Sequence, residues 1–157
     1  HAPHNAAGGT APLWNHASTV VASFTVYASP TFKATSAQPS GSTKACLSCH
    51  DGTVAPDSFG GATGTAPMLT GAALIGTDLS NDHPVSIVYD AALSTAHQGI
   101  KDPMVFPGIG TGTIDATMLR AGKLECSSCH DVHGAGIAKL LVKSNTGSAL
   151  CLTCHAK

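Results

Sequence analysis

CLSCH (residues 46–50), CSSCH (126–130) and CLTCH (151–155) contain all six cysteines of this 157-residue chain. In each stretch two residues separate the cysteines, and a histidine follows the second cysteine at once. Histidine makes up about 6% of the chain, so composition alone would place one after all three pairs in roughly 2 of 10,000 sequences. The three stretches are therefore repeats of one chemical unit.

This spacing is the signature of covalent attachment to haem c. The two thiols add to the two vinyl groups of the porphyrin, and the imidazole of the next residue reaches the iron as its proximal ligand. We therefore expect three covalently bound haems c. The expected attachment residues are Cys46, Cys49, Cys126, Cys129, Cys151 and Cys154, and the expected proximal ligands are His50, His130 and His155.

Paired cysteines have three other common uses in proteins. Six cysteines could form a disulfide framework, and two Cys-x-x-Cys pairs could form a zinc ribbon, but neither explains the histidine after every pair. Thioredoxin-like redox chemistry would need a βαβ pattern, which the sequence does not show.

The composition favours the same conclusion. Apolar residues make up 43% of the chain, which argues against disorder, but aromatic residues make up only 4%. The chain also contains 17 glycines and 9 prolines, so large haem macrocycles are expected to replace side chains in its interior. The expected fold is mostly coil with little regular secondary structure: a small multihaem cytochrome c wrapped around a haem chain.

Local patterns predict few regular elements. Short helices are expected at the three motifs, a strand over 18–29, a second short strand over 85–89, and one or two helical turns over 115–122. Residues 31–45, 52–67 and 107–113 are expected to be loops. We expect a single trihaem domain over 1–157, in which residues 1–60 hold the first haem and residues 80–157 hold the other two.

Six histidines remain for the second axial position of each iron. The preferred distal ligands are His16, His83 and His133. His16 lies directly before the predicted strand, and His83 is followed by a proline that stiffens the chain. His133 lies three residues past a proximal histidine. His1, His4 and His97 are possible distal or inter-subunit ligands. Met68, Met104 and Met118 are expected to serve packing instead.

The net charge of −1 excludes a nucleic-acid binder that works through a basic face. The sequence contains no run of 18 apolar residues, so no transmembrane segment is predicted. The sequence begins at His1 rather than Met, which suggests a mature secreted protein whose export signal has been removed. The expected location is extracellular or at the cell surface, with the periplasm as the alternative.

The chain resembles the bacterial multihaem c-type cytochromes of metal-reducing and related anaerobic bacteria. The resemblance rests on WNHASTVVASFTVYASP (14–30), CLSCHDGTVA (46–55), NDHPVSIVY (81–89), CSSCHDVHG (126–134) and LCLTCHAK (150–157). Some members polymerise into extracellular filaments in which a histidine of one subunit completes a haem of the next. The better-known filament members carry more than three haems, and in this respect the chain departs from them.

These observations favour electron transfer through bis-histidine haems rather than catalysis, because six-coordinate iron has no open position for a substrate. The expected partners are copies of the chain itself in a head-to-tail polymer, other redox cytochromes, or an extracellular electron acceptor. A soluble periplasmic shuttle is the alternative. A multihaem reductase would need one open haem and a basic funnel, whereas the chain has only eight Lys and Arg residues without an evident cluster.

Overall fold

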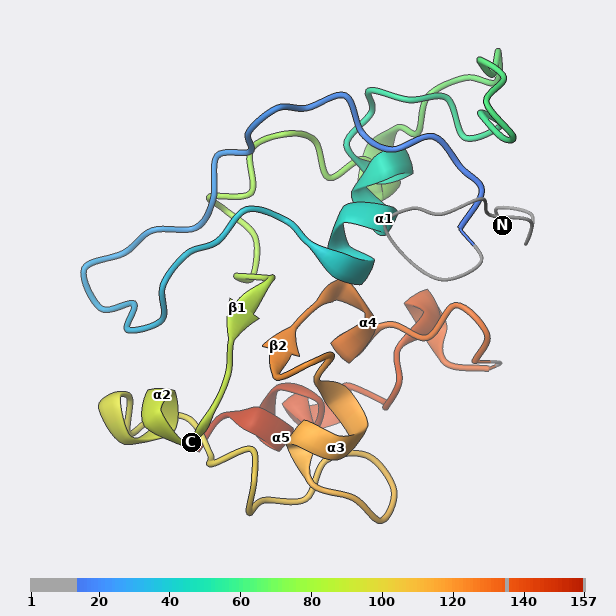
Figure 1. The fold of residues 1–157 in the computed structure, drawn as a ribbon. Coiled ribbons are helices and arrows are strands. Elements are labelled where there is room, and N and C mark those ends of the chain that lie inside the picture. The colour runs from blue at the N-terminus through green and yellow to red at the C-terminus, as the bar shows by residue number, and fades with distance from the viewer. Residues whose placement is uncertain (1–13, 135, 157) are drawn as a thin grey trace. The chain divides into compact units, whose positions relative to one another are not determined.

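The computed structural model describes residues 14–134 and 136–156, so His1 and His4 lie outside the described residues. Most of the described chain is coil, with short helices and two short strands (Figure 1). The predicted fold class is confirmed. The elements are α1 (Gly41–His50), η1 (Gly71–Ala73), β1 (Ile87–Val88), α2 (Ala91–Ala96), α3 (Ile114–Met118), β2 (Lys123–Leu124), α4 (Cys126–Cys129), η2 (Ala138–Leu140), η3 (Thr146–Ser148) and α5 (Cys151–Cys154).

The chain divides into two compact units. Unit 1 comprises His1–Ala28 and Ser36–Ser86, and unit 2 comprises Ser29–Thr35 and Ile87–Lys157. The first CXXCH motif belongs to unit 1, and the second and third belong to unit 2. The organisation as one domain, with residues 1–60 and 80–157 serving different haems, stays a prediction.

Helix α1 carries the first motif at its carboxyl end. It begins at Gly41, so the predicted loop over 31–45 is wrong in its last five residues. The helix ends where the backbone N–H of Asp51 donates to the carbonyl of Leu47 at 2.9 Å. The chain then turns at Gly52, whose φ of +76° favours glycine, and where a Cβ would lie 2.7 Å from Leu74. The turn therefore sets the direction in which the chain leaves the motif.

Residues 18–29 form no continuous strand, and the prediction of one there is wrong. Among the described residues the segment forms one isolated bridge, between Thr25 and Asp78. At Phe24 the side chain of Gln38 bonds both backbone groups, accepting from the N–H at 2.8 Å and donating to the carbonyl at 3.0 Å. Because a side chain satisfies these groups, no neighbouring strand is needed. Phe24 packs with Leu47 and Leu79 in the small core of unit 1.

Unit 2 contains the only β-ladder within the described ranges, in which β1 pairs antiparallel with β2, Ile87 opposite Leu124. The strand predicted over 85–89 is thus confirmed in two residues. The helical turn predicted within 115–122 is confirmed as α3, which starts one residue earlier and is capped by Thr113, whose hydroxyl accepts from the N–H of Ala116 at 3.3 Å. Helix α2 was not expected, although Asp90 caps it by accepting from the N–H of Leu93.

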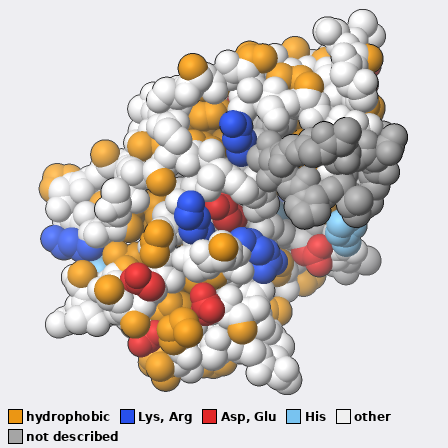
Figure 2. All heavy atoms as spheres, viewed as in Figure 1, with side chains coloured by type: hydrophobic (Ala, Val, Ile, Leu, Met, Phe, Trp, Pro, Cys, Tyr) orange, Lys and Arg blue, Asp and Glu red, His pale blue; other side chains and the backbone are white. Residues whose placement is uncertain are grey.

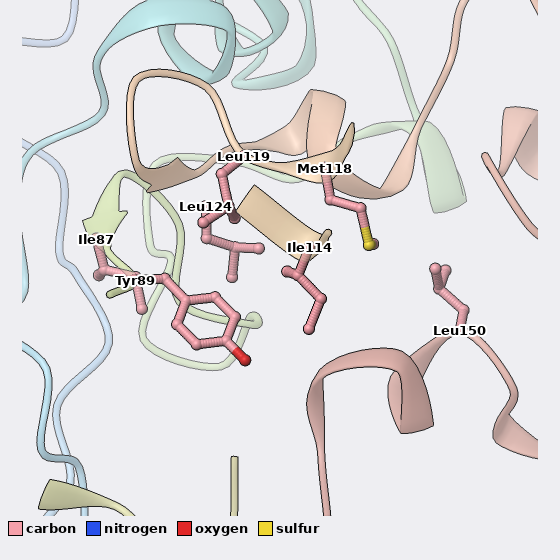
Figure 3. Close-up of a cluster of buried hydrophobic side chains, with 7 residues drawn as sticks. All are labelled: Ile87, Tyr89, Ile114, Met118, Leu119, Leu124 and Leu150. Atoms are coloured by element: carbon pink, nitrogen blue, oxygen red, sulfur yellow. The ribbon is translucent and has the colours of Figure 1, made fainter. Parts of the chain in front are cut away.

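The side chains of β1, β2 and α3 meet in the larger core of unit 2 (Figure 3). Ile114 is fully buried there, and Met118 is 2% exposed, which confirms packing as the role of this methionine. Met68 and Met104 are exposed instead. The core consists of Ile87, Tyr89, Ile114, Met118, Leu119, Leu124 and Leu150, with Cys129 and Cys154 packed against it.

The described residues contain no helix with the length and apolar character that a membrane crossing requires. On the face drawn in Figure 2, charged side chains are few and lie among hydrophobic and uncharged ones. This sparse distribution reflects the low content of charged residues, which is 11% of the chain.

Candidate haem-binding sites

Each motif lies on a short helix, as predicted. Because its two cysteines are three residues apart in the sequence, the helix places both on the same face. The proximal histidine ends the helix: His50 is the last residue of α1, whereas His130 and His155 follow α4 and α5 in extended conformation. All six cysteines are free thiols, so the disulfide alternative finds no support.

A buried hydroxyl precedes the second cysteine in all three motifs. Ser48 donates to the carbonyl of Lys44 at 2.9 Å, and Thr153 donates to that of Ala149 at 3.0 Å. Ser128 accepts from the N–H of Glu125 at 2.9 Å as part of a capping box that starts α4. The sequence carries this signal as Ser, Ser and Thr at equivalent positions, and the hydroxyls stabilise the turn that holds each cysteine pair.

The proximal histidines His50 and His130 have a defined tautomer. Nδ1 of His50 donates to the carbonyl of Ala73 at 2.7 Å, and Nδ1 of His130 donates to that of Lys139 at 2.9 Å. A carbonyl oxygen only accepts, so the proton of each neutral ring must sit on Nδ1. Nε2 then keeps its lone pair, which is the form in which an imidazole binds iron while its other nitrogen fixes the ring.

His155, the third expected proximal ligand, is half-buried and held by its backbone. Its N–H donates to the carbonyl of Cys151 at 2.9 Å, and it forms an isolated bridge with Ile100. The end of α5 is thereby fixed against the segment that follows α2.

Burial favours the protonated form of three of the six thiols. Burial raises the pKa of Cys49 and of Cys129, and it raises the pKa of Cys154 to about 11. Within residues 14–134 and 136–156 no three His, Cys, Asp or Glu side chains form a group that could hold a metal ion. The zinc alternative therefore finds no support.

His16 lies at the first motif. Its ring is 5% exposed, and Nε2 lies 3.4 Å from Sγ of Cys49. The ring nitrogens face the carbonyls of Ala17 at 2.6 Å and Ala55 at 3.0 Å, while Phe59 packs edge-on at 5.5 Å between ring centroids. The structure thus brings together two residues that lie 33 positions apart in the sequence. Ligation of iron by His16 stays a prediction.

The other described histidines have different surroundings. His83 is exposed with Nδ1 3.1 Å from the carbonyl of Pro84, and His133 is exposed with its backbone N–H donating to Asp131 at 2.9 Å. Nδ1 of His97 accepts from the N–H of Gly99 at 3.1 Å, which places the proton of the neutral ring on Nε2. His97 is therefore in the tautomer opposite to that of the proximal histidines.

Sequence reasoning missed a buried carboxylate beside the first motif. Asp51 is 4% exposed and accepts from the backbone N–H and the hydroxyl of Thr53, both at 2.8 Å, and from the hydroxyl of Thr19. The N–H of Thr19 in turn donates to Ser48 at 3.2 Å. These bonds fasten the segment that carries His16 to the motif. The Asp-Gly-Thr that follows His50 is the only signal in the sequence.

Sequence reasoning also missed a tyrosine beside the third motif. The buried hydroxyl of Tyr89 donates to the carbonyl of Lys101 at 2.6 Å and lies 3.4 Å from that of Cys154. Burial and the neighbouring Cys154 hold the pKa of Tyr89 well above its usual range, so the hydroxyl stays a donor. Lys101 also donates to the carbonyl of Leu152 from Nζ at 2.6 Å. Together these bonds position α5.

The residues therefore fit covalent haem: free paired thiols, two imidazoles with Nε2 available, and a buried histidine beside one thiol pair. A family model for the doubled CXXCH motif matches residues 118–157, which contain the second and third motifs. These motifs indicate covalent c-type haem. This family match covers about a quarter of the chain. A search of curated proteins found none that matches the chain. The comparison supports the resemblance to c-type cytochromes and a function in haem-based electron transfer.

Proposed function

We propose that the chain binds three haems c and passes electrons through them without acting as an enzyme. The tautomer of His50 and His130 carries this proposal, because a carbonyl at Nδ1 presents Nε2 to the iron at two of the three motifs. When bound, haem supplies one-electron chemistry at its iron. The protein holds each haem by two thioether bonds and one imidazole, and it tunes the potential through burial and hydrogen bonds.

A second imidazole at each iron, from His16, His83 and His133, completes the proposed ligation. Two histidine ligands held in both oxidation states keep reorganisation small and give negative potentials, suited to low-potential acceptors. His1, His4 and His97 remain further candidates, including for a haem of another subunit. The burial of His16 beside Cys49 supports its role at the first haem.

We further propose that the protein is extracellular and assembles head to tail into a conductive filament. The unequal charge of the two units supports contact between unlike units: unit 1 contains one Lys and four Asp, whereas unit 2 contains seven of the eight Lys and Arg residues and five acidic ones. Contact between unit 2 of one copy and unit 1 of the next is heterologous, and it generates an open polymer when it does not close. A periplasmic shuttle is the alternative.

Three measurements test this function. Mass spectrometry should find haem on all three motif peptides, and two or fewer would contradict the count. The reduced protein should bind no CO, whereas strong binding at one haem in three would favour a reductase. Electron microscopy of native protein from the medium and cell surface should show filaments, and discrete particles would favour the shuttle.

Single histidine replacements test the ligands. His16→Ala, His83→Ala or His133→Ala should each convert one haem of three to a high-spin, CO-binding form, because the iron loses its sixth ligand. A fully low-spin spectrum in any of these variants would exclude that histidine as a ligand. The same replacement at His97 tests the remaining described candidate, and it should leave all three haems low-spin if His16, His83 and His133 are the three distal ligands.

A further inference from the structure

Trp14 has a buried donor without an acceptor. Its indole Nε1 is inaccessible to solvent, and it has no hydrogen-bond partner among the described residues. An indole N–H can only donate, and buried donors in native proteins are almost always paired. This donor therefore points to an acceptor that residues 14–134 and 136–156 do not supply.

The indole ring of Trp14 lies beside His16, which contacts the first CXXCH motif. The rings of Trp14 and His16 are 6.1 Å apart between centroids and tilted by 60°. His16 is in turn 3.4 Å from Sγ of Cys49. A haem attached to this motif would thus lie within reach of both side chains, which stand two residues apart on the same segment.

The carboxylates beside this segment are already engaged. Asp51 accepts from Thr19 and Thr53, and Asp57 accepts from the backbone N–H groups of Thr65 at 3.1 Å and Ala66 at 2.9 Å. The strong acceptors on haem are its two propionate carboxylates, whereas the rest of the macrocycle is largely apolar. A propionate is therefore the acceptor whose chemistry suits the indole N–H.

We propose that Trp14 donates from Nε1 to a propionate of the haem attached at residues 46–50, an inference that rests on the proposed haem at this motif. Trp14 is then a positioning residue that fixes the haem against the segment carrying His16. The bond also offsets part of the negative charge of the propionate, so it favours the reduced iron and raises the potential of this haem.

The chain has a single tryptophan, so its indole N–H gives one unambiguous NMR signal. In the ¹⁵N-labelled holoprotein this signal should exchange slowly with solvent and should shift between the oxidised and reduced states. An indole signal that exchanges rapidly, or that is identical in both states, would overturn the inference. This measurement needs no variant.

Trp14→Phe removes the donor and keeps an aromatic ring. One of the three redox transitions should move to a more negative potential while the haem content stays at three. The control is Phe106→Leu, which removes an exposed aromatic ring of unit 2 and no donor, and which should leave the indole signal and that transition in place. Unchanged potentials in Trp14→Phe, with haem on the Cys46 peptide, would overturn this inference alone. Wild-type protein without haem on that peptide would overturn the proposed function at this motif as well.

Discussion

The two units hold their motifs in different ways. In unit 1 the motif lies at the end of the ten-residue helix α1, and its own Leu47 forms a cluster of three buried residues with Phe24 and Leu79 in the described part of the chain. In unit 2 the motifs lie on four-residue helices, and their cysteines pack against a core of seven residues supplied mostly by other segments. The first motif is therefore part of what folds unit 1, whereas the other two are attached to a core that exists beside them.

The largest expected effect comes from removing a cysteine pair. Cys46→Ala with Cys49→Ala should remove the first haem and unfold most of unit 1, because its side-chain core is small. Cys151→Ala with Cys154→Ala should remove one haem and leave the β1–β2 core protected. Hydrogen exchange resolved by peptide would measure both effects. Equal loss of protection from exchange in the two units would contradict the proposal that unit 1 depends more on its motif than unit 2 does.

A second comparison uses the same motif position in each unit. Leu47 is 1% exposed and Leu152 is 37% exposed, although both follow the first cysteine of their motif. Leu47→Ala should lower the free energy of unfolding by about 2–5 kcal/mol, whereas Leu152→Ala should change it by less than about 0.5 kcal/mol. Denaturant unfolding of the two holoprotein variants would measure this difference in the free energy of unfolding. If both substitutions lowered the free energy of unfolding by similar amounts, the packing of unit 1 would depend on haem rather than on Leu47.

A third comparison concerns the buried carboxylates next to the motifs, Asp51 in unit 1 and Glu125 in unit 2. Asp51→Ala leaves the donors of Thr19 and Thr53 without their acceptor and should cost about 1–3 kcal/mol. Glu125→Ala removes one side of the capping box of α4 and should cost about 1 kcal/mol. Thermal unfolding would rank the two variants, and the reverse order would contradict the role given to Asp51.

The smallest expected effect concerns pH. Backbone N–H groups of Ala66 and Thr65 hold the pKa of Asp57 below its usual range. The ionised form thus stabilises the loop, fully so above the pKa of the unfolded chain, and this contribution is lost as pH falls through the lower pKa of the folded state. Asp57 is exposed, so the effect is small. NMR titration of its carboxyl carbon should show the lowered pKa. Asp57→Asn should flatten the acid dependence of unit 1 stability and leave unit 2 unchanged.

Much of the secondary structure followed from local sequence. Cysteines three residues apart predicted the motif helices, and the β-branched residues of 85–89 predicted β1. The strand expected over 18–29 has the same local pattern, but Gln38 bonds the backbone of Phe24, and Thr25 pairs with Asp78 in a single bridge. Propensity describes what a segment tends to form, whereas the available partners decide whether a ladder forms.

The sequence by itself determined the attachment chemistry, since two thiols and an imidazole must be neighbours along the chain to bind one haem. It also determined the coil-rich character, through small residues, glycine and proline. Only the tertiary structure decided that His16 reaches Cys49, that Tyr89 holds the third motif, and that the donor of Trp14 is left without a protein acceptor among the described residues. These contacts join residues far apart in sequence, or depend on which groups burial leaves unpaired, and neither property can be obtained from the spacing of residues along a chain.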